Sequence, residues 1–197
     1  MINENFVIVA IIINALGNLG YLIKTLKGEI KPNKVTFLLF GLAPFIAFSA
    51  QIEQGVGMQS FLAFATGLFA LAIFVASFLN KKAYWRMTLF DLICGGLSIL
   101  GLFLWYITKN GNVAIIFSLS ADFLAALPTI VKSFKFPETE SAYPWLLVSI
   151  SGLLTLLTIQ RWTFADYSFP VYGFLINLII FALVKFQIGR VKILDKN

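Results

Sequence analysis

The chain has 197 residues, of which 59% are hydrophobic and only 12% are charged, and it contains no histidine. Soluble domains contain about 25% charged residues, so the composition excludes a soluble globular protein and predicts an all-α integral membrane protein. The lack of histidine excludes His-based metal sites and catalytic triads, and the single cysteine, Cys94, excludes an intrachain disulfide. No nucleotide-binding motif is present, and we expect no metal, no cofactor and no enzymatic activity.

Seven stretches of the chain are long and apolar enough to cross a bilayer, which takes about 20 residues. The first stretch lacks the preceding basic residues of a signal peptide, so we expect it to be retained. The sequence therefore predicts one membrane domain over residues 1–197, with seven transmembrane helices. In chain order the predicted helices are Phe6–Ile23, Val35–Ile52, Gly57–Leu79, Met87–Ile107, Val113–Val131, Tyr143–Ile159 and Phe169–Phe186.

The positions of the lysines and arginines predict the orientation of these helices. Thirteen of the fifteen lie in the first, third and fifth loops and the C-terminal tail, and only Lys109 and Arg161 lie on the other side. Cytoplasmic loops carry an excess of these residues, so the N-terminus is predicted to face out and the C-terminus to face the cytoplasm. The net charge of +6 is then explained by topology and not by nucleic-acid binding. We expect a multi-pass protein of a cell membrane, and the compact chain favours a bacterial inner membrane.

A weak internal repeat relates the two halves of the chain. The segment YLIKTLKGEIKPNKVTF, residues 21–37, aligns with TIVKSFKFPETESAYPW, residues 129–145. The offset of 108 places Lys24 on Lys132 and Phe37 on Trp145. It also places Asn14 on Asp122, outside the aligned segment. Residues 1–80 would then form one triple-helix repeat, residues 81–110 a linker helix and residues 111–197 a second repeat in the same orientation.

Parallel repeats related by an axis along the membrane normal are typical of transporters, whose solute site lies near mid-membrane where the repeats meet. Together with the outward N-terminus and the chain length, this 3+1+3 plan resembles the SWEET sugar transporters and the wider PQ-loop superfamily. Locally, Pro128 is predicted to end a helix, a polar segment with Glu140 follows, and Pro144 opens the next helix, as in that family.

The resemblance implies a role in alternating access for the prolines at helix ends, so Pro128 and Pro144 are candidate hinges. Pro44, inside the second predicted helix, removes one backbone hydrogen bond there and is a third candidate. Trp145 lies near a position where the family has large side chains on the inner side of the cavity. The family's sugar-binding asparagines on helices 3 and 7 have no clear match, because the asparagine of the last helix, Asn177, lies further along.

Asp122 is the strongest candidate for a functional residue. It lies about nine residues into its predicted helix, near mid-membrane, where a charged group costs about 2.5–3.5 kcal/mol on insertion scales. Ser118 and Thr129 lie on the same helix face as Asp122. We expect these residues, together with Asn14 and Asn177, to bind the solute, or Asp122 to carry a coupling proton. The structural alternative is that Asp122 hydrogen-bonds Asn14 or Ser118 and fixes helix register. Glu138 and Glu140 are interpreted as solvated loop acids beside lysines, or as part of an inner gate.

These observations predict a membrane transporter of a small polar solute, sugar-like or another small metabolite, by facilitated or proton-coupled alternating access. The alternative is a non-transporting receptor, or an assembly or lipid-binding factor, on the same scaffold. The expected partners are the lipid bilayer and the solute, and a chain of this size works alone or as a homo-oligomer.

Overall fold

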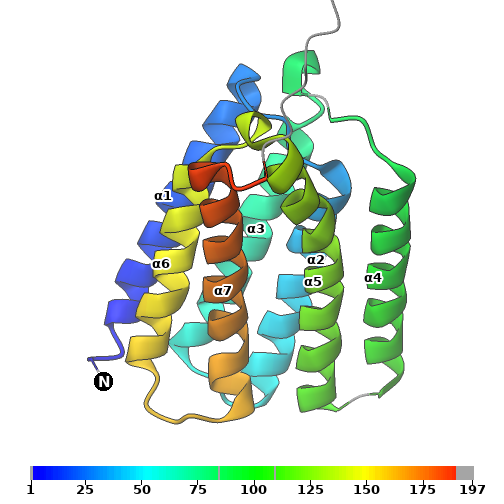
Figure 1. Ribbon diagram of the computed structural model, residues 1–197. Coiled ribbons are helices and arrows are strands. Elements are labelled where there is room, and N and C mark those ends of the chain that lie inside the picture. Colours follow the sequence, from blue (N-terminus) through cyan, green and yellow to red (C-terminus); the bar gives the residue numbers. More distant parts are fainter. Residues whose placement is uncertain (1, 84, 109, 190–197) are drawn as a thin grey trace, which may run out of the picture.

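The computed structural model describes residues 2–83, 85–108 and 110–189, and every regular element in these ranges is helical (Figure 1). Four basic residues that entered the charge count, Lys109, Arg190, Lys192 and Lys196, lie outside this part. The three short 3-10 helices are η1 (Met58–Ser60), η2 (Lys81–Ala83) and η3 (Pro137–Thr139). The α-helices are α1 (Phe6–Lys27), α2 (Lys34–Glu53), α3 (Phe61–Ala76), α4 (Leu89–Thr108), α5 (Gly111–Lys135), α6 (Ala142–Thr158) and α7 (Phe164–Phe186).

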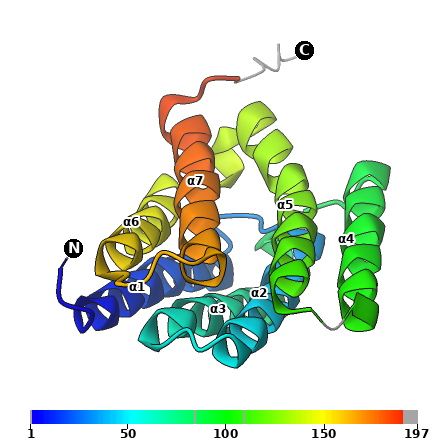
Figure 2. The ribbon, with the colours of Figure 1, turned by 90° about the horizontal axis from the view of Figure 1, so that it is seen from below.

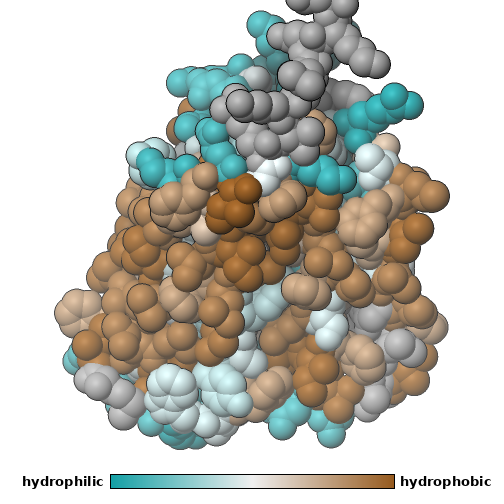
Figure 3. Space-filling model, viewed as in Figure 1, coloured by the Kyte–Doolittle hydropathy of each residue, from teal (hydrophilic) through white to brown (hydrophobic). Residues whose placement is uncertain are grey.

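The surface of the bundle is that of an all-helical membrane protein. Five of the described helices are long and apolar enough to cross a membrane, namely α1, α2, α3 with η1, α5 and α7. Helix α6, with 17 residues, and the apolar part of α4, Leu89–Leu100, are shorter. Large hydrophobic side chains are exposed along the helices, and in Figure 3 they form a broad apolar belt with hydrophilic residues gathered at both ends. Such a belt is stable against lipid but not against water.

Six of the helices form a closed ring. Following the ring, α1 packs against α3, α3 against α2, α2 against α5, α5 against α7, α7 against α6, and α6 against α1. Helix α4 lies outside the ring, beside α5 (Figure 2). The interior of the ring is therefore enclosed by helices from both halves of the chain, and α4 contributes nothing to it.

The turn between α1 and α2 is specified locally. Gly28 follows the last residue of α1 with φ of 72°, in the left-handed region that only glycine adopts without strain. The side chain of Asn33 then accepts hydrogen bonds from the backbone N–H groups of Val35 and Thr36, at 3.1 and 3.2 Å. These bonds satisfy donors that the first turn of α2 would leave unpaired.

Helix α7 begins earlier than predicted. The sequence places its start at Phe169, whereas the structure begins the helix at Phe164. Thr163 and Asp166 form a capping box in which the Asp166 carboxylate accepts hydrogen bonds from the backbone N–H and the hydroxyl of Thr163. The polarity of this first turn hides it from a search for apolar residues, but the Thr-x-x-Asp spacing is a recognisable start signal.

The prediction that Pro128 ends a helix is wrong. Helix α5 continues through Pro128 to Lys135, although the proline removes one backbone hydrogen bond. The two turns after the proline are held by tertiary contacts, because Thr129, Lys132 and Ser133 are all buried. Packing therefore overrides the local signal for a helix end.

Candidate functional site

A cavity lies inside the ring, and each of the six ring helices contributes to its wall. The cavity has a volume of about 50 Å³, several times the roughly 10–15 Å³ that one water molecule needs. The cavity therefore has room for a small solute. Its polar lining residues include Asn14, Asn18, Thr66, Asp122, Ser151, Tyr172 and Asn177.

Among the described residues, Asp122 on α5 is the only charged one that lines this cavity. Its side chain is buried, and its Oδ1 atom has no hydrogen-bond partner among the described residues. The hydroxyl group of Tyr172 on α7 lies beside the carboxyl group. The two groups are close enough to interact, but neither the Tyr172 hydroxyl nor Asp122 Oδ1 makes a hydrogen bond of standard geometry among the described residues. Buried polar groups are normally paired, so this unpaired carboxyl group is available to a bound solute or a proton.

Asn14 on α1 connects three helices at the cavity wall. Its side-chain nitrogen donates to the Thr66 hydroxyl on α3 at 3.2 Å and to the Ser151 hydroxyl on α6 at 3.4 Å. The side-chain nitrogen of Asn18 donates to the side-chain oxygen of Asn14 at 3.0 Å and to the backbone carbonyl of Asn14 at 2.9 Å. Asn14 is thus already engaged by protein groups, in contrast to Asp122.

Asn177 on α7 also lines the cavity. Its side-chain nitrogen donates to the backbone carbonyl of Gly173, one turn earlier in the same helix, at 2.7 Å. This bond orients the amide without linking it to another helix. The structure therefore brings together Asp122, Asn14 and Asn177, three of the five predicted solute-binding residues.

The other two, Ser118 and Thr129, are outside the cavity lining. The Ser118 hydroxyl donates to the carbonyl of Ala43 on α2 at 2.6 Å. The Thr129 hydroxyl donates to the Thr36 hydroxyl, also on α2, at 3.0 Å. Both residues hold α5 against α2, because the helix face that carries Asp122 is divided between the cavity and this neighbour.

Among the predicted hinge residues, Pro44, Pro144 and Trp145 line the cavity. Pro128 does not; it lies in a surface groove between α5 and α4, together with Asp91. Pro144 is in the first turn of α6, where a proline is tolerated, whereas Pro44 is inside α2 and removes a backbone hydrogen bond there.

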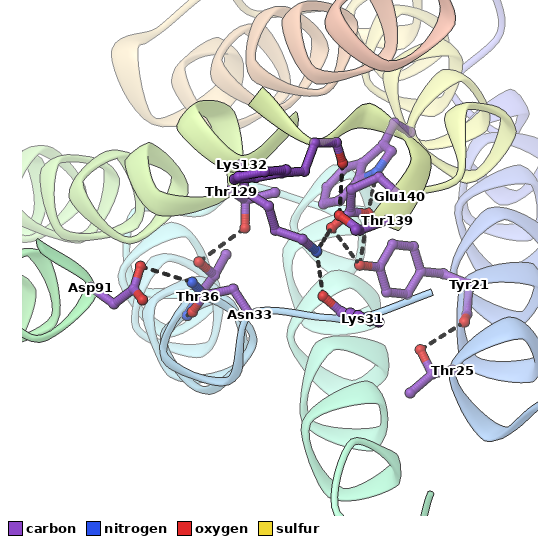
Figure 4. A network of polar contacts seen from close by, with 12 residues as sticks. Tyr21, Thr25, Lys31, Asn33, Thr36, Asp91, Thr129, Lys132, Thr139 and Glu140 are labelled. Atoms are coloured by element: carbon purple, nitrogen blue, oxygen red, sulfur yellow. Dashed lines mark hydrogen bonds and ion pairs between the residues drawn. The ribbon is translucent and has the colours of Figure 1, made fainter. Parts of the chain in front are cut away.

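A buried cluster around Glu140 closes one end of the ring (Figure 4). The Glu140 carboxylate pairs with the Lys132 ammonium group at 2.6 Å, and the exposed fractions of the two side chains are 0% and 1%. The same carboxylate accepts hydrogen bonds from the Tyr21 hydroxyl, at 2.9 Å to the nearer oxygen, and from the Trp145 indole N–H at 3.3 Å. The Lys132 ammonium group also donates to the carbonyl of Lys31 in the α1–α2 loop.

This cluster joins groups from both halves of the chain and touches the cavity. Tyr21 and Trp145 bind Glu140 and also line the cavity, and their rings lie 5.5 Å apart in an edge-to-face arrangement. The interpretation of Glu140 as a solvated loop acid is therefore wrong, because tertiary packing buries it, whereas Glu138 is exposed. The sequence signal that could have found it is the Lys-x7-Glu spacing across a short loop, which is common and therefore weak.

The opposite end of the ring is held by hydrogen bonds to backbone carbonyls and by apolar packing. The side chain of Gln51 on α2 donates to the carbonyl of Ala165 on α7 at 2.8 Å, and Arg161 donates to the carbonyl of Gly55 at 2.9 Å. Phe169 lines the cavity at this end and packs in a buried apolar cluster with Ala47, Leu62 and Ala63. The two ends therefore differ in chemistry, with a buried ion pair only at the Glu140 end of the described ring.

Residues 108 positions apart make corresponding contacts in the two halves. A Cβ atom on Gly17 of α1 would lie 2.9 Å from the carbonyl oxygen of Pro144 on α6. Adding 108 to the first residue and subtracting it from the second gives Ala125 on α5 and Thr36 on α2, and the Thr36 hydroxyl donates to the Ala125 carbonyl at 2.7 Å. Both helix pairs thus contact each other at matching positions.

The described residues contain no group of three or more Cys, Asp or Glu side chains that could hold a metal ion. In comparisons with known proteins, no protein-family model, no curated protein and no solved structure matches this chain.

Proposed function

We propose that this protein transports a small polar solute across a membrane by alternating access. The observation that carries the proposal is the unpaired Asp122 carboxyl group inside a cavity enclosed by helices from both halves of the chain. Intramembrane acids that face the interior of a bundle are characteristic of solute and proton pathways. A purely structural carboxyl group would have its oxygens satisfied by the protein.

In this proposal α1–α3 and α5–α7 are two parallel repeats, and all seven α-helices cross the membrane with the N-terminus outside. The packing supports it, because α1–α3, α2–α3 and α1–α6 correspond one by one to α5–α7, α6–α7 and α5–α2. Asn14 and Asp122, which the offset of 108 relates, line the same cavity. We propose accordingly that the protein is a divergent member of the SWEET and PQ-loop superfamily.

The conformational change in this proposal opens the contacts at one end of the ring while those at the other end stay closed. The Glu140 cluster forms the inner gate, and the contacts of Gln51, Arg161 and Phe169 form the outer one. Opening at the inner side separates Glu140 from Tyr21, which belongs to the other repeat. Pro44 and Pro144 are candidate bending points next to the cavity: Pro44 removes a backbone hydrogen bond inside α2, and Pro144 lies where the chain enters α6. Transport is then facilitated or coupled to protons, in a cell membrane, by one chain or by a homo-oligomer.

The proposal is tested without knowing the solute by measuring access to the cavity. Thr66→Cys in a Cys94→Ser background places a near-isosteric thiol on the cavity wall. We expect a small membrane-impermeant methanethiosulfonate reagent to modify it in right-side-out and in inside-out vesicles. The unaltered chain is the control, because its only cysteine, Cys94, is buried in α4 and outside the cavity.

Modification from one side only, or from neither, would contradict alternating access and favour a non-transporting receptor or assembly factor. A thermal-shift screen against sugars, polyols, amino acids, nucleosides and organic cations then identifies candidate solutes, since a ligand that binds the folded state stabilises it. Uptake of the strongest ligand into proteoliposomes, compared with Asp122→Asn, completes the test.

A further inference from the structure

The cavity combines one acid with many aromatic rings. In the part of the chain that the structure describes, Asp122 is the only charged lining residue, and no lysine or arginine of this wall neutralises the carboxylate. Six of its lining residues are aromatic, from α1, α2, α6 and α7: Tyr21, Phe37, Phe40, Trp145, Phe169 and Tyr172. Aromatic faces attract cations, and the attraction is strongest where water is excluded.

The amide groups of the wall offer little to a neutral, hydroxyl-rich solute. The side-chain nitrogen of Asn14 already makes two hydrogen bonds to protein acceptors, and so does that of Asn18. Asn177 donates to its own helix. Since an amide nitrogen has two hydrogens, the donors of Asn14 and Asn18 are fully used. Among the fully buried polar atoms of the wall, Asp122 Oδ1 and the Tyr172 hydroxyl are the ones without a hydrogen bond of standard geometry, and Asn177 keeps a second N–H and its side-chain oxygen for a ligand.

A buried carboxylate without a partner is unfavourable unless a positive charge or a proton reaches it. A bound cation would supply that charge, and the surrounding rings would contact its apolar part. The space inside the cavity limits the ligand to a compact molecule. From this geometry we propose that the transported solute is a small organic cation whose charged nitrogen binds at Asp122. This inference rests on the proposed transport function and names its substrate class.

The test compares cations with neutral molecules of the same shape. Choline is paired with 3,3-dimethylbutan-1-ol and protonated ethanolamine with propan-1-ol, and the melting temperature of the purified protein is measured with each. We expect at least one cation to raise the melting temperature well above its neutral partner, as mass action requires for a specific ligand. Asp122→Asn should weaken that cation's affinity about tenfold or more, whereas Asp91→Asn, which removes a buried acid outside the cavity, should leave it unchanged.

Asp122→Glu keeps the charge and guards against a general loss of folding in Asp122→Asn. It should still bind the cation in preference to the neutral partner. The inference is overturned if neither cation stabilises the protein more than its neutral partner, or if Asp122→Asn retains the preference. Stabilisation by sugars or polyols alone would also overturn it, although transport would stand. Cation binding in a protein whose Thr66→Cys thiol is reached from one side only would leave Asp122 as a cation-binding residue but overturn transport.

Discussion

The backbone N–H of Lys31 donates a hydrogen bond to the carbonyl of Thr139 at 3.0 Å, and the two residues are 108 positions apart. Two equivalent positions of a two-fold arrangement can contact each other only at the axis. Phe37 and Trp145, also 108 positions apart, contact each other as well, with ring centroids 6.2 Å apart. The axis of the proposed repeat therefore passes through the Glu140 end of the ring and on into the cavity.

The polar cluster lies near this axis but is asymmetric, because equivalent positions of the two halves carry different residues. Lys132 pairs with Glu140, but the position 108 residues before Glu140 is Pro32, which offers no carboxylate. The equivalent of Lys132 is Lys24, whose ammonium group donates instead to the Ser141 hydroxyl at 2.8 Å. The described ion pair at this junction thus comes from one half of the chain, although both halves contribute backbone groups to the junction.

Replacing Gly17 with alanine should destabilise the protein by about 1–3 kcal/mol, the usual cost of overpacking a close contact. The new Cβ atom would lie 2.9 Å from the Pro144 carbonyl oxygen and 3.0 Å from the Leu147 Cβ atom, so α1 and α6 would have to separate. The measurement is the free energy of unfolding in detergent.

Gly20→Ala is the matched control for that change. No atom lies within 4 Å of a Cβ built at Gly20, and alanine is favoured over glycine inside a helix by about 0.5–1 kcal/mol. The control should be as stable as the unaltered protein or slightly more so. If Gly17→Ala and Gly20→Ala are equally stable, α1 and α6 are not in contact at this level.

Ser118→Ala and Thr129→Val should lower stability without changing ligand affinity. Each removes a hydrogen bond from α5 to α2, at 2.6 and 3.0 Å, and interhelical hydrogen bonds in membrane proteins contribute on average about 0.6 kcal/mol, and at most ~1.7. The thermal shift given by a cavity ligand is measured for both variants beside Asp122→Asn. A loss of affinity in either variant as large as that in Asp122→Asn would show that these residues bind the solute.

Much of the arrangement could be predicted from the sequence because membrane helices are specified by long apolar runs. The offset of 108, derived from a few lysines and aromatic residues, relates Asn14 to Asp122, and the structure places both on one cavity. This prediction was possible because Asp122 is an acid in an apolar helix, and such a carboxyl group requires a polar environment or a partner.

The sequence could not separate residues that share a helix face. Ser118, Asp122 and Thr129 lie on one face of α5, but that face meets both α2 and the cavity, and only the packing of the ring decides which side chain meets which. The burial of Glu140 also depends on packing between distant parts of the chain, so the sequence does not predict it. Its partner Tyr21 is distant in sequence, and the Lys-x7-Glu spacing is too common to indicate that the loop folds inward.

If Asp122 carries the coupling proton, Asp122→Asn should abolish uphill uptake of the solute and leave solute exchange intact. The asparagine side chain keeps the size of the carboxyl group but cannot release a proton. Both activities are measured in proteoliposomes, with and without a proton gradient. An equal loss of uptake and exchange would instead assign Asp122 to direct solute binding, as the inference of a cationic solute requires.

The proposed topology predicts the side from which two exposed positions are reached. In a Cys94→Ser background, Arg161→Cys should react with an impermeant maleimide in right-side-out vesicles, and Glu138→Cys should react only after permeabilisation. Both side chains are exposed at opposite ends of the bundle. The reverse pattern would place the N-terminus in the cytoplasm, and reaction of both in intact vesicles would contradict a membrane crossing by α6, the helix between them.

Glu140→Gln should open the cavity toward the cytoplasm. Removing one partner of a buried ion pair costs about 3–5 kcal/mol because the other charge is left uncompensated, and here Lys132 would remain buried. The cost falls on the conformation in which the inner gate is closed, and every 1.4 kcal/mol changes the ratio of open to closed forms tenfold. We therefore expect the Thr66→Cys thiol to react faster in inside-out vesicles and more slowly in right-side-out vesicles.

Glu138→Gln is the control for this prediction, because Glu138 is an exposed acid two residues earlier in the same loop. It removes the same charge without touching the buried pair, and the reaction rates should not change. A second variant, Lys132→Met with Glu140→Leu, replaces the pair by apolar groups and should restore the stability of the closed form, since such replacements are often neutral. If the Thr66→Cys thiol reacts at the same rates in Glu140→Gln as in Glu138→Gln, measured from each side, the Glu140 cluster does not control access to the cavity.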